Sequence, residues 1–295
     1  MTERAHFRHF RIADIDIKME SDLAFTKNTL HPKFKHFEVN DPVKDAILIR
    51  HHFTLPDLKE KDLGDEVYRR PPWRIYKNSG YWVYLGTSPI QVDKRLHRVA
   101  TFNANYTRAS IYNDEKANFL KGNLHSLTMF STDQIVLANI LVDRQGCYLH
   151  SCGVNFEGKG LLFIGHSAAG KSTIAKILKD KAEVLCDDRI IVRNTRDGLK
   201  IYGTWDNGEV QDVSPNSAPL KAIMFLHKAE ENLLMPLEDK KEITRRLLVY
   251  LIKPFVTIEW WQKALSIVEK IAGEVPCYEL KFDKSGKVVD ILGKI

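Results

Sequence analysis

The sequence of 295 residues predicts an α/β domain with a mixed sheet, preceded by a smaller, β-rich domain of α+β character. Three observations support this prediction. Short strands broken by turn residues fill the first part of the chain, strands and helices alternate in the second part, and a glycine-rich loop joins one of those strands to a helix. The character changes near residues 125–131, so we assign residues 1–128 and 129–295 to the two domains.

The composition is that of an ordinary globular protein, with 44% hydrophobic and 28% charged residues. The net charge of +6 is spread along the chain without a block of like charges, which favours anionic ligands such as nucleotides over a nucleic-acid partner. The four cysteines lack metal-site spacing, and we expect buried, reduced thiols. Because the sequence shows neither a signal segment nor an apolar run of membrane-spanning length, we expect a cytoplasmic protein without a membrane partner.

The first part of the chain reads as strands. Ile12–Met19 alternates polar and apolar residues with a period of two, which predicts one strand. Further strands are expected at Ala46–Phe53, Trp73–Tyr76 and Tyr81–Leu85, with a hairpin turn at Asn78-Ser79-Gly80. The segment Arg69–Trp73 contains two prolines and cannot be helical. We interpret it as a surface loop, although its two arginines could instead bind an anionic partner.

Strands and helices alternate from residue 132 onward. Thr132-Asp133-Gln134 predicts the capped start of a helix that ends near Gly146. A four-residue polar turn joins two strands that must therefore be antiparallel neighbours. The expected elements are strands Cys147–Phe156 and Leu161–Ile164, helix Lys171–Lys179, strands Val184–Cys186, Ile190–Arg193, Leu199–Tyr202 and Ala222–Leu226, helices Lys240–Leu251 and Thr257–Ala272, and strand Val275–Phe282. We interpret Trp260-Trp261 as core rather than as a partner surface.

A phosphate-binding loop is the strongest functional signal. The pattern G-x-x-x-x-G-K-[ST] is matched by Gly165-His166-Ser167-Ala168-Ala169-Gly170-Lys171-Ser172-Thr173. We expect Gly165 and Gly170 to adopt torsions closed to other residues, so that successive N–H groups surround phosphate oxygens. The helix N-terminus adds its positive dipole end, Lys171 would contact the β- and γ-phosphates, and Ser172 would bind Mg²⁺. All nine residues are candidates for nucleotide binding; a coincidental glycine turn is the alternative.

Two adjacent acids form the second signal. Asp187 and Asp188 follow the predicted strand Val184–Cys186, sixteen residues after Lys171. That strand should run parallel to Leu161–Ile164, so its carboxyl end reaches the sheet edge where ligands bind. Adjacent side chains on an extended backbone point in opposite directions, so one carboxylate could hold Mg²⁺ while the other accepts a hydroxyl proton. The alternative is an acidic pair that is solvated or paired with Arg189.

His150 is a third candidate. It lies on the strand that pairs with Leu161–Ile164, and it reaches the start of the phosphate loop only if that pairing is long. Sequence does not fix the register, so both a site residue and a structural histidine are open interpretations.

Residues 147–190 resemble the catalytic domain of HPr kinase/phosphorylase, a family that phosphorylates a protein serine and shares its nucleotide-binding architecture with phosphoenolpyruvate carboxykinase. The positions at matching spacings are His150, Gly165, Ser167, Gly170, Lys171, Ser172, Asp187 and Asp188, and Glu274–Leu280 is similar to the C-terminal strand of relatives. The resemblance implies that Asp187 is the base that receives the serine hydroxyl proton, that His150 modulates it, and that Ser172 and Asp188 bind the metal.

The sequence also departs from that family. Ala168 replaces its middle glycine, Thr173 stands where it usually has glutamate, and Lys200–Gly203 lacks its glutamate-containing signature, for which Glu209 could substitute. Its arginine-bearing phosphorylase loop has no match, and residues 1–125 do not resemble its N-terminal domain. Kinase chemistry therefore carries over, whereas the HPr substrate and the reverse phosphorolysis do not.

The resulting expectation is an ATP- and Mg²⁺-dependent kinase whose acceptor is a serine hydroxyl of a protein or peptide. Two alternatives stay open. The first is a kinase of small-molecule hydroxyls, with the N-terminal domain forming the acceptor pocket and a deep cavity above Asp187. The second is a nucleotide-binding module with only slow hydrolysis. The sequence leaves the choice between a monomer and a homo-oligomer open.

Overall fold

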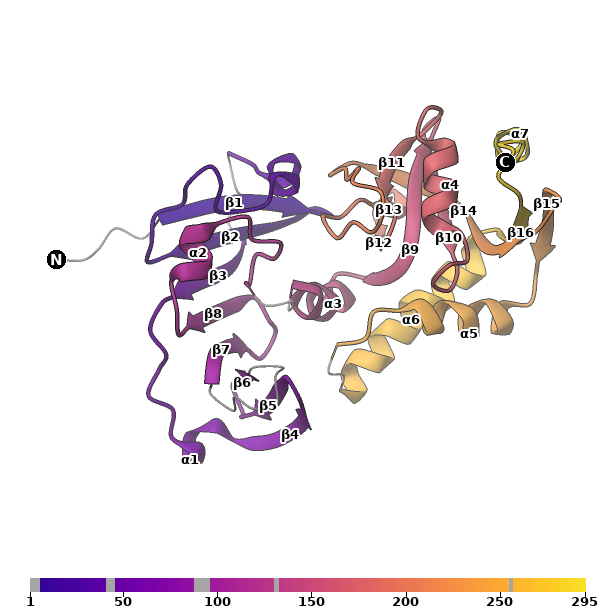
Figure 1. The fold of residues 1–295 in the computed structure, drawn as a ribbon. Coiled ribbons are helices and arrows are strands. Elements are labelled where there is room, and N and C mark those ends of the chain that lie inside the picture. Colours follow the sequence, from indigo (N-terminus) through magenta and orange to yellow (C-terminus); the bar gives the residue numbers. More distant parts are fainter. Residues whose placement is uncertain (1–5, 41–45, 88–95, 130–132, 255–256) are drawn as a thin grey trace. The chain divides into compact units, whose positions relative to one another are not determined.

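The structure is a computed structural model that describes residues 6–40, 46–87, 96–129, 133–254 and 257–295 (Figure 1). The chain divides into two compact units, Met1–Val136 and Leu137–Ile295. The second unit combines a mixed sheet with helices, which confirms the α/β character predicted for it. The first unit is rich in strands, and its sheet also contains parallel pairs. Among the described residues, no helix is long and apolar enough to cross a membrane.

The first unit is built on one eight-stranded sheet with the order β1-β2-β3-β8-β7-β6-β5-β4. Its strands are β1 (His6–Ile12), β2 (Ile15–Ser21), β3 (Ile47–His52), β4 (Asp65–Arg70), β5 (Trp73–Lys77), β6 (Tyr81–Thr87), β7 (Leu96–Asn103) and β8 (Arg108–Asn113). The pairs β2–β3 and β3–β8 are parallel, and the other neighbours are antiparallel. Short helical segments follow the strands: η1 (Pro32–Phe37), α1 (Glu60–Leu63) and α2 (Ala117–Lys121).

Two predictions for this unit are wrong. Ile12–Met19 is not one strand, because Ala13 and Asp14 adopt positive φ values of 49° and 57° and turn the chain between β1 and β2. A two-residue turn with positive φ matches the twist of antiparallel strands, and it places Ile12 and Ile15 on one face, which shifts the alternation by one residue. The sequence does not reveal the turn because Ala13 is apolar and continues the alternation of β2. Arg69 and Arg70 lie in β4 rather than in a loop, and only the two prolines turn the chain into β5.

The second unit contains β9 (Gly146–Phe156), β10 (Lys159–Ile164), β11 (Glu183–Cys186), β12 (Arg189–Thr195), β13 (Gly198–Tyr202), β14 (Ser217–Lys228), β15 (Leu233–Leu237) and β16 (Cys277–Phe282). The hydrogen-bonded path is β10-β9-β12-β13-β14-β16-β15, and β10 also pairs with β14. Strands β9, β10, β12, β13 and β14 therefore form a closed ring. Gly160 lies where the ring closes, since a Cβ there would stand 2.8 Å from the Pro219 carbonyl oxygen.

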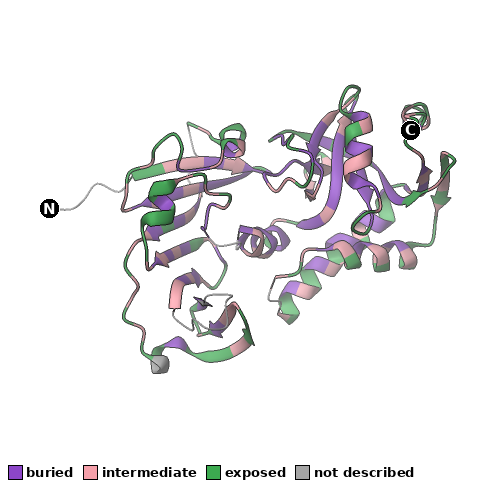
Figure 2. Cartoon of the chain, viewed as in Figure 1, coloured by how far each residue is buried: buried purple, intermediate pink, exposed green. Residues whose placement is uncertain are grey.

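Helices cover this sheet on two sides. One core cluster contains side chains of α5 (Lys240–Tyr250) and α6 (Ile258–Glu274), and the other contains side chains of α4 (Lys171–Leu178) and α7 (Val288–Leu292). Between these helices, β9 and β10 are buried along nearly their whole length (Figure 2). The result is a layered arrangement of helices around a buried sheet, as the alternating pattern predicted.

Most predicted elements of the second unit are confirmed to within one or two residues. The last strand starts at Cys277 rather than Val275 because α6 continues to Glu274. Trp260 is buried and donates its indole N–H to the Ala138 carbonyl at 3.0 Å, which confirms the core interpretation. Helix α3 spans Asp133–Asp143, whereas the predicted cap residue Thr132 lies outside the described residues. All four cysteines are buried and free, as expected.

Gly203 fixes the segment that follows β13. A Cβ at this position would lie 1.9 Å from the Ser214 carbonyl oxygen and 2.8 Å from that of Leu185. We expect Gly203→Ala to lower the free energy of unfolding by about 1–3 kcal/mol, because two backbone segments would have to separate. Gly273→Ala in α6 is the control. No atom lies within 4 Å of its added Cβ, and we expect it to raise stability by about 0.5–1 kcal/mol. Denaturant unfolding measures the free energy of unfolding of both variants. Equal changes in the two variants would contradict the assigned close contact at Gly203.

Candidate functional site

The loop between β10 and α4 contains two residues with positive φ, and only one of them is a glycine. Gly170 is the N-cap of α4 with φ of 110°, and a Cβ there would lie 2.6 Å from the Phe282 ring. Gly165, by contrast, does not adopt positive φ, so the prediction that it supplies an unusual torsion is wrong. A glycine is needed at this position because an added Cβ would clash with the Cβ of Ala169, at a distance of 2.6 Å. The second left-handed residue of the loop is Ala168, with φ of 67°.

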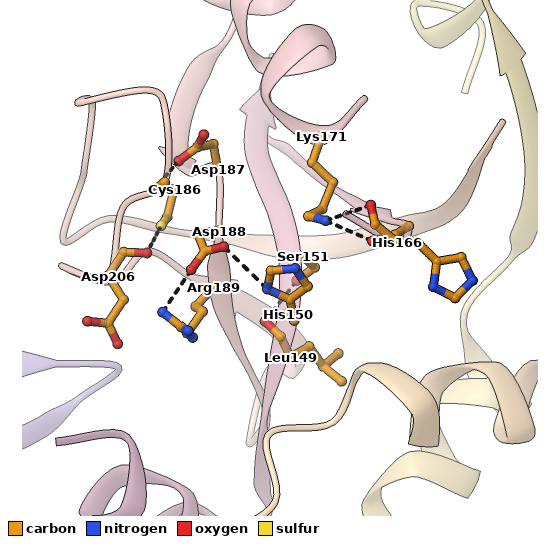
Figure 3. Close-up of polar contacts among 12 residues, drawn as sticks. Leu149, His150, Ser151, His166, Lys171, Cys186, Asp187, Asp188, Arg189 and Asp206 are labelled. Carbon is orange, nitrogen blue, oxygen red and sulfur yellow. Dashed lines mark hydrogen bonds and ion pairs between the residues drawn. The ribbon is translucent and has the colours of Figure 1, made fainter. Parts of the chain in front are cut away.

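A cavity of about 320 Å³ lies over this loop and the first turn of α4. It is lined by His150, Ser167, Ala168, Gly170, Lys171, Ser172, Thr173, Asp187, Asp188, Gly208, Glu209 and Lys228. The structure therefore brings together the loop, both predicted acids and the predicted histidine. Gly165, His166 and Ala169 are not among the lining residues. The His166 ring points away from Lys171 (Figure 3) and lies against the Tyr250 ring, with centroids 5.4 Å apart.

The ammonium group of Lys171 is held by the loop itself. Its Nζ donates to the carbonyl oxygens of Gly165 at 2.7 Å and His166 at 3.2 Å (Figure 3). Burial lowers the pKa of Lys171, and the nearby carboxylate of Asp188 opposes this shift. A charged donor with three hydrogens can exchange carbonyl oxygens for phosphate oxygens without losing hydrogen bonds.

Asp187 and Asp188 point apart and have different partners, as expected for neighbours on an extended strand (Figure 3). Asp187 is 1% exposed, and its two oxygens accept the backbone N–H groups of Gly208 at 2.7 Å and Val210 at 3.0 Å. These bonds compensate a buried charge without a cation. They also hold residues 208–210 against the cavity, and Gly208 makes this close approach easy, since a Cβ there would lie 3.1 Å from the carboxylate.

Asp188 lies between two side chains that can be cations. Its oxygens lie 3.3 Å from His150 Nδ1 and 2.7 Å from an Arg189 nitrogen. The pairing of Arg189 predicted as an alternative therefore exists, yet Asp188 still lines the cavity. The resemblance implies that His150 modulates Asp187, whereas the structure places its ring nitrogen against Asp188.

The strand register brings His150 to the site. The β9–β10 ladder extends to the pair Ser151–Ile164, so His150 lies opposite the start of the loop. This is the long pairing that the site interpretation required. Burial lowers the pKa of His150, the positive charge of Lys171 lowers it further, and Asp188 opposes both.

Sequence analysis missed two residues of the site and left a third uncertain. Gly208 makes the close approach to Asp187, and Lys228 ends β14 beside the loop. The sequence predicts the strand Ala222–Leu226 but not its parallel pairing with β10, which brings the carboxyl ends of both strands to one edge. Glu209 does line the cavity and forms a 3.1 Å ion pair with Lys176 of α4. Arg245 and Arg246 pair with Glu242 on α5, and Arg246 also pairs with Glu279 of β16 at 2.9 Å.

The donor set of the cavity fits Mg²⁺ bound together with phosphate. The Ser172 hydroxyl and the Asp188 carboxylate line the same space, with Glu209 at its rim. Within the described ranges, no three His, Cys, Asp or Glu side chains gather in a group that could hold a metal. Mg²⁺ commonly uses one or two carboxylates and completes its shell with water and phosphate oxygens, so oxygen donors of this kind suit it.

Ala168 carries a backbone conformation that favours glycine. We expect Ala168→Gly to raise the free energy of unfolding by roughly 1 kcal/mol, because its side chain is exposed and only the torsional strain is removed. Ser167→Gly is the control, since Ser167 is also exposed but lacks positive φ. It should leave stability unchanged or lower it. Denaturant unfolding of both variants measures the difference, and a destabilised Ala168→Gly would contradict the assigned strain.

Comparisons with known proteins give two findings, and no curated protein matches the chain. Among solved structures, the Hpr(Ser) kinase/phosphatase from Coxiella burnetii matches with a TM-score of 0.31 and 11% sequence identity, over 50% of this chain and 90% of that chain. The model of the protein family described as SynChlorMet cassette protein ScmC matches residues 116–295, which is more than half of the chain. The chain therefore belongs to the family of SynChlorMet cassette protein ScmC.

Proposed function

We propose that this protein is an ATP-dependent phosphotransferase that transfers the γ-phosphoryl group to a serine hydroxyl of a protein or peptide. One observation carries the proposal: the G-x-x-x-x-G-K-[ST] loop and two carboxylates line one cavity. Phosphoryl transfer needs an anion-binding loop, a metal site and a group that orients the nucleophile, and little else from the protein.

The loop and α4 would bind the phosphates of ATP. Loop N–H groups and the positive end of the eight-residue helix α4 supply fixed partial charges. Lys171 would leave the carbonyl oxygens of Gly165 and His166 and bind the β- and γ-phosphate oxygens. Ser172 and Asp188 would hold Mg²⁺, which when bound neutralises part of the phosphate charge. His150 and Arg189 would keep the Asp188 carboxylate in place for that task.

Asp187 would accept the proton of the acceptor hydroxyl, the role that the resemblance implies. The serine oxygen would form a bond to the γ-phosphorus as the bond to the β-phosphate oxygen breaks, and ADP would leave. The two backbone N–H groups occupy one lone pair on each Asp187 oxygen, and a carboxylate has about four acceptor positions in all. They also fix the carboxylate, which favours transfer in one geometry.

The size of the cavity supports an acceptor that approaches from outside it. A volume of about 320 Å³ is at the lower end of the range for small-molecule sites, and the phosphates of ATP would use it. A small acceptor would need further enclosed space above Asp187. We therefore propose a chain segment carrying a serine rather than a small molecule.

One observation favours a second function, a nucleotide-binding module with only slow hydrolysis. Asp187 is 1% exposed and already accepts two backbone hydrogen bonds. If this carboxylate only holds residues 208–210 in place, nucleotide would bind without transfer to a hydroxyl.

Labelled-phosphate transfer tests the proposal. The protein is incubated with γ-labelled ATP, Mg²⁺ and candidate acceptors, namely lysate proteins and peptides encoded beside its gene, and labelled serine is identified by mass spectrometry. We expect Asp187→Asn to reduce transfer by at least about 100-fold with nucleotide binding retained, because the base is lost. Lys171→Ala should reduce binding and transfer together.

Asp212→Asn is the control. Asp212 is an exposed aspartate two residues beyond Val210, and the variant should be fully active. Nucleotide binding without transfer to any acceptor by the unmodified protein would favour the binding module. Equal loss of binding and transfer in Asp187→Asn would assign that residue to holding the loop.

A further inference from the structure

Lys228 is a second cation beside the phosphate loop. It is the last residue of β14, whose Phe225 pairs in parallel with Ile164 at the end of β10. Lys228 is therefore three residues beyond the partner of Ile164, at the level of the loop that follows β10. On the other side its backbone pairs with Phe282 of β16. The β14–β16 ladder thus fixes its backbone, and the β10–β14 ladder fixes the strand that leads to it.

The side chain of Lys228 runs past the glycine that begins α4. A Cβ built on Gly170 would lie 3.7 Å from Lys228 Cε and 2.6 Å from the Phe282 ring. Lys228 also lines the cavity together with Lys171 and Ser172. Its ammonium group is exposed and forms no ion pair with any residue in the described part of the chain.

Every other charged group of the cavity lining already has a partner. Asp187 binds two backbone N–H groups, Asp188 contacts Arg189, and Glu209 pairs with Lys176. The Lys171 ammonium is bound to loop carbonyls. Among the described residues of the lining, Lys228 is therefore the cation that an anionic ligand can contact without breaking an existing interaction.

We infer that Lys228 is a phosphate-binding residue that makes the cavity select a nucleoside triphosphate over the diphosphate. The inference rests on the proposed function, because it takes the ligand to be the nucleotide. Loop N–H groups, the α4 N-terminus and Lys171 can together bind a diphosphate. A third phosphate adds charge and acceptor oxygens, and a lysine on a flexible stem at the rim is suited to meet them. Once that phosphate has been transferred, Lys228 loses its contact, which favours release of the diphosphate.

Binding of a non-hydrolysable ATP analogue and of ADP, measured by calorimetry with Mg²⁺, tests this role. For Lys228→Ala we expect about tenfold or greater weakening for the triphosphate analogue and less than about twofold for ADP, since one charge-assisted contact is worth about that factor. Lys228→Arg should retain most of the preference. Lys221→Ala, an exposed lysine on the same strand, is the matched control and should bind both nucleotides normally.

The outcomes separate this inference from the proposed function. If the unmodified protein binds neither nucleotide, both are wrong. If it binds both, and Lys228→Ala weakens the two nucleotides equally or not at all, only the role of Lys228 is overturned. Because Lys228 is exposed, its substitution should leave the thermal unfolding midpoint unchanged, which checks that the variant is folded.

Discussion

The hydrogen bonding of β10 on both of its edges determines where every part of the candidate site lies. β10 is antiparallel to β9 and parallel to β14, and its residues Leu161–Ile164 are fully buried. Its last residue, Ile164, is paired on both sides, so the loop must begin at a fixed point. The same registers place His150 across from the loop and Lys228 alongside it. A slip of one residue in either ladder would turn these side chains to the opposite face.

A second constraint is the need to compensate the negative charges of Asp187 and Asp188. A buried charge needs compensation, and the structure provides it in two ways for two neighbouring residues. Backbone N–H groups compensate Asp187, and this ties residues 208–210 to the cavity. The Arg189 guanidinium compensates Asp188 and the His150 ring lies beside it, which leaves Asp188 partly open to the cavity. Asp187 is therefore held rigidly and Asp188 is accessible. A rigid carboxylate suits the positioning of an acceptor hydroxyl, and an accessible one suits metal binding.

Two of the departures from the HPr kinase/phosphorylase pattern can be described in physical terms. Ala168 stands where that family has a glycine, and it adopts the left-handed backbone conformation that a glycine would adopt without strain. For a residue with a Cβ this conformation has an energetic cost. The missing glutamate signature leaves Glu209 as the further acid at the cavity, where residues 208–210 bring it beside α4.

The sequence by itself determined the elements whose signals are local. Turn residues and periodicity were enough for the β9–β10 hairpin and α5, and the loop motif was enough for the start of α4. Residues of that motif line one cavity together with Asp187 and Asp188. Periodicity failed at Ala13-Asp14, because the apolar turn residue Ala13 continues the alternation of β2, although the turn shifts the alternation of β1 by one residue.

Only the tertiary structure decided the long-range relations. The pairing of His150 with Asp188, the backbone bonds of Asp187 to Gly208 and Val210, and the arrival of Lys228 all join segments that are distant along the chain. Such contacts depend on strand register and ring closure, which are set by packing of the whole sheet and leave no local pattern in the sequence.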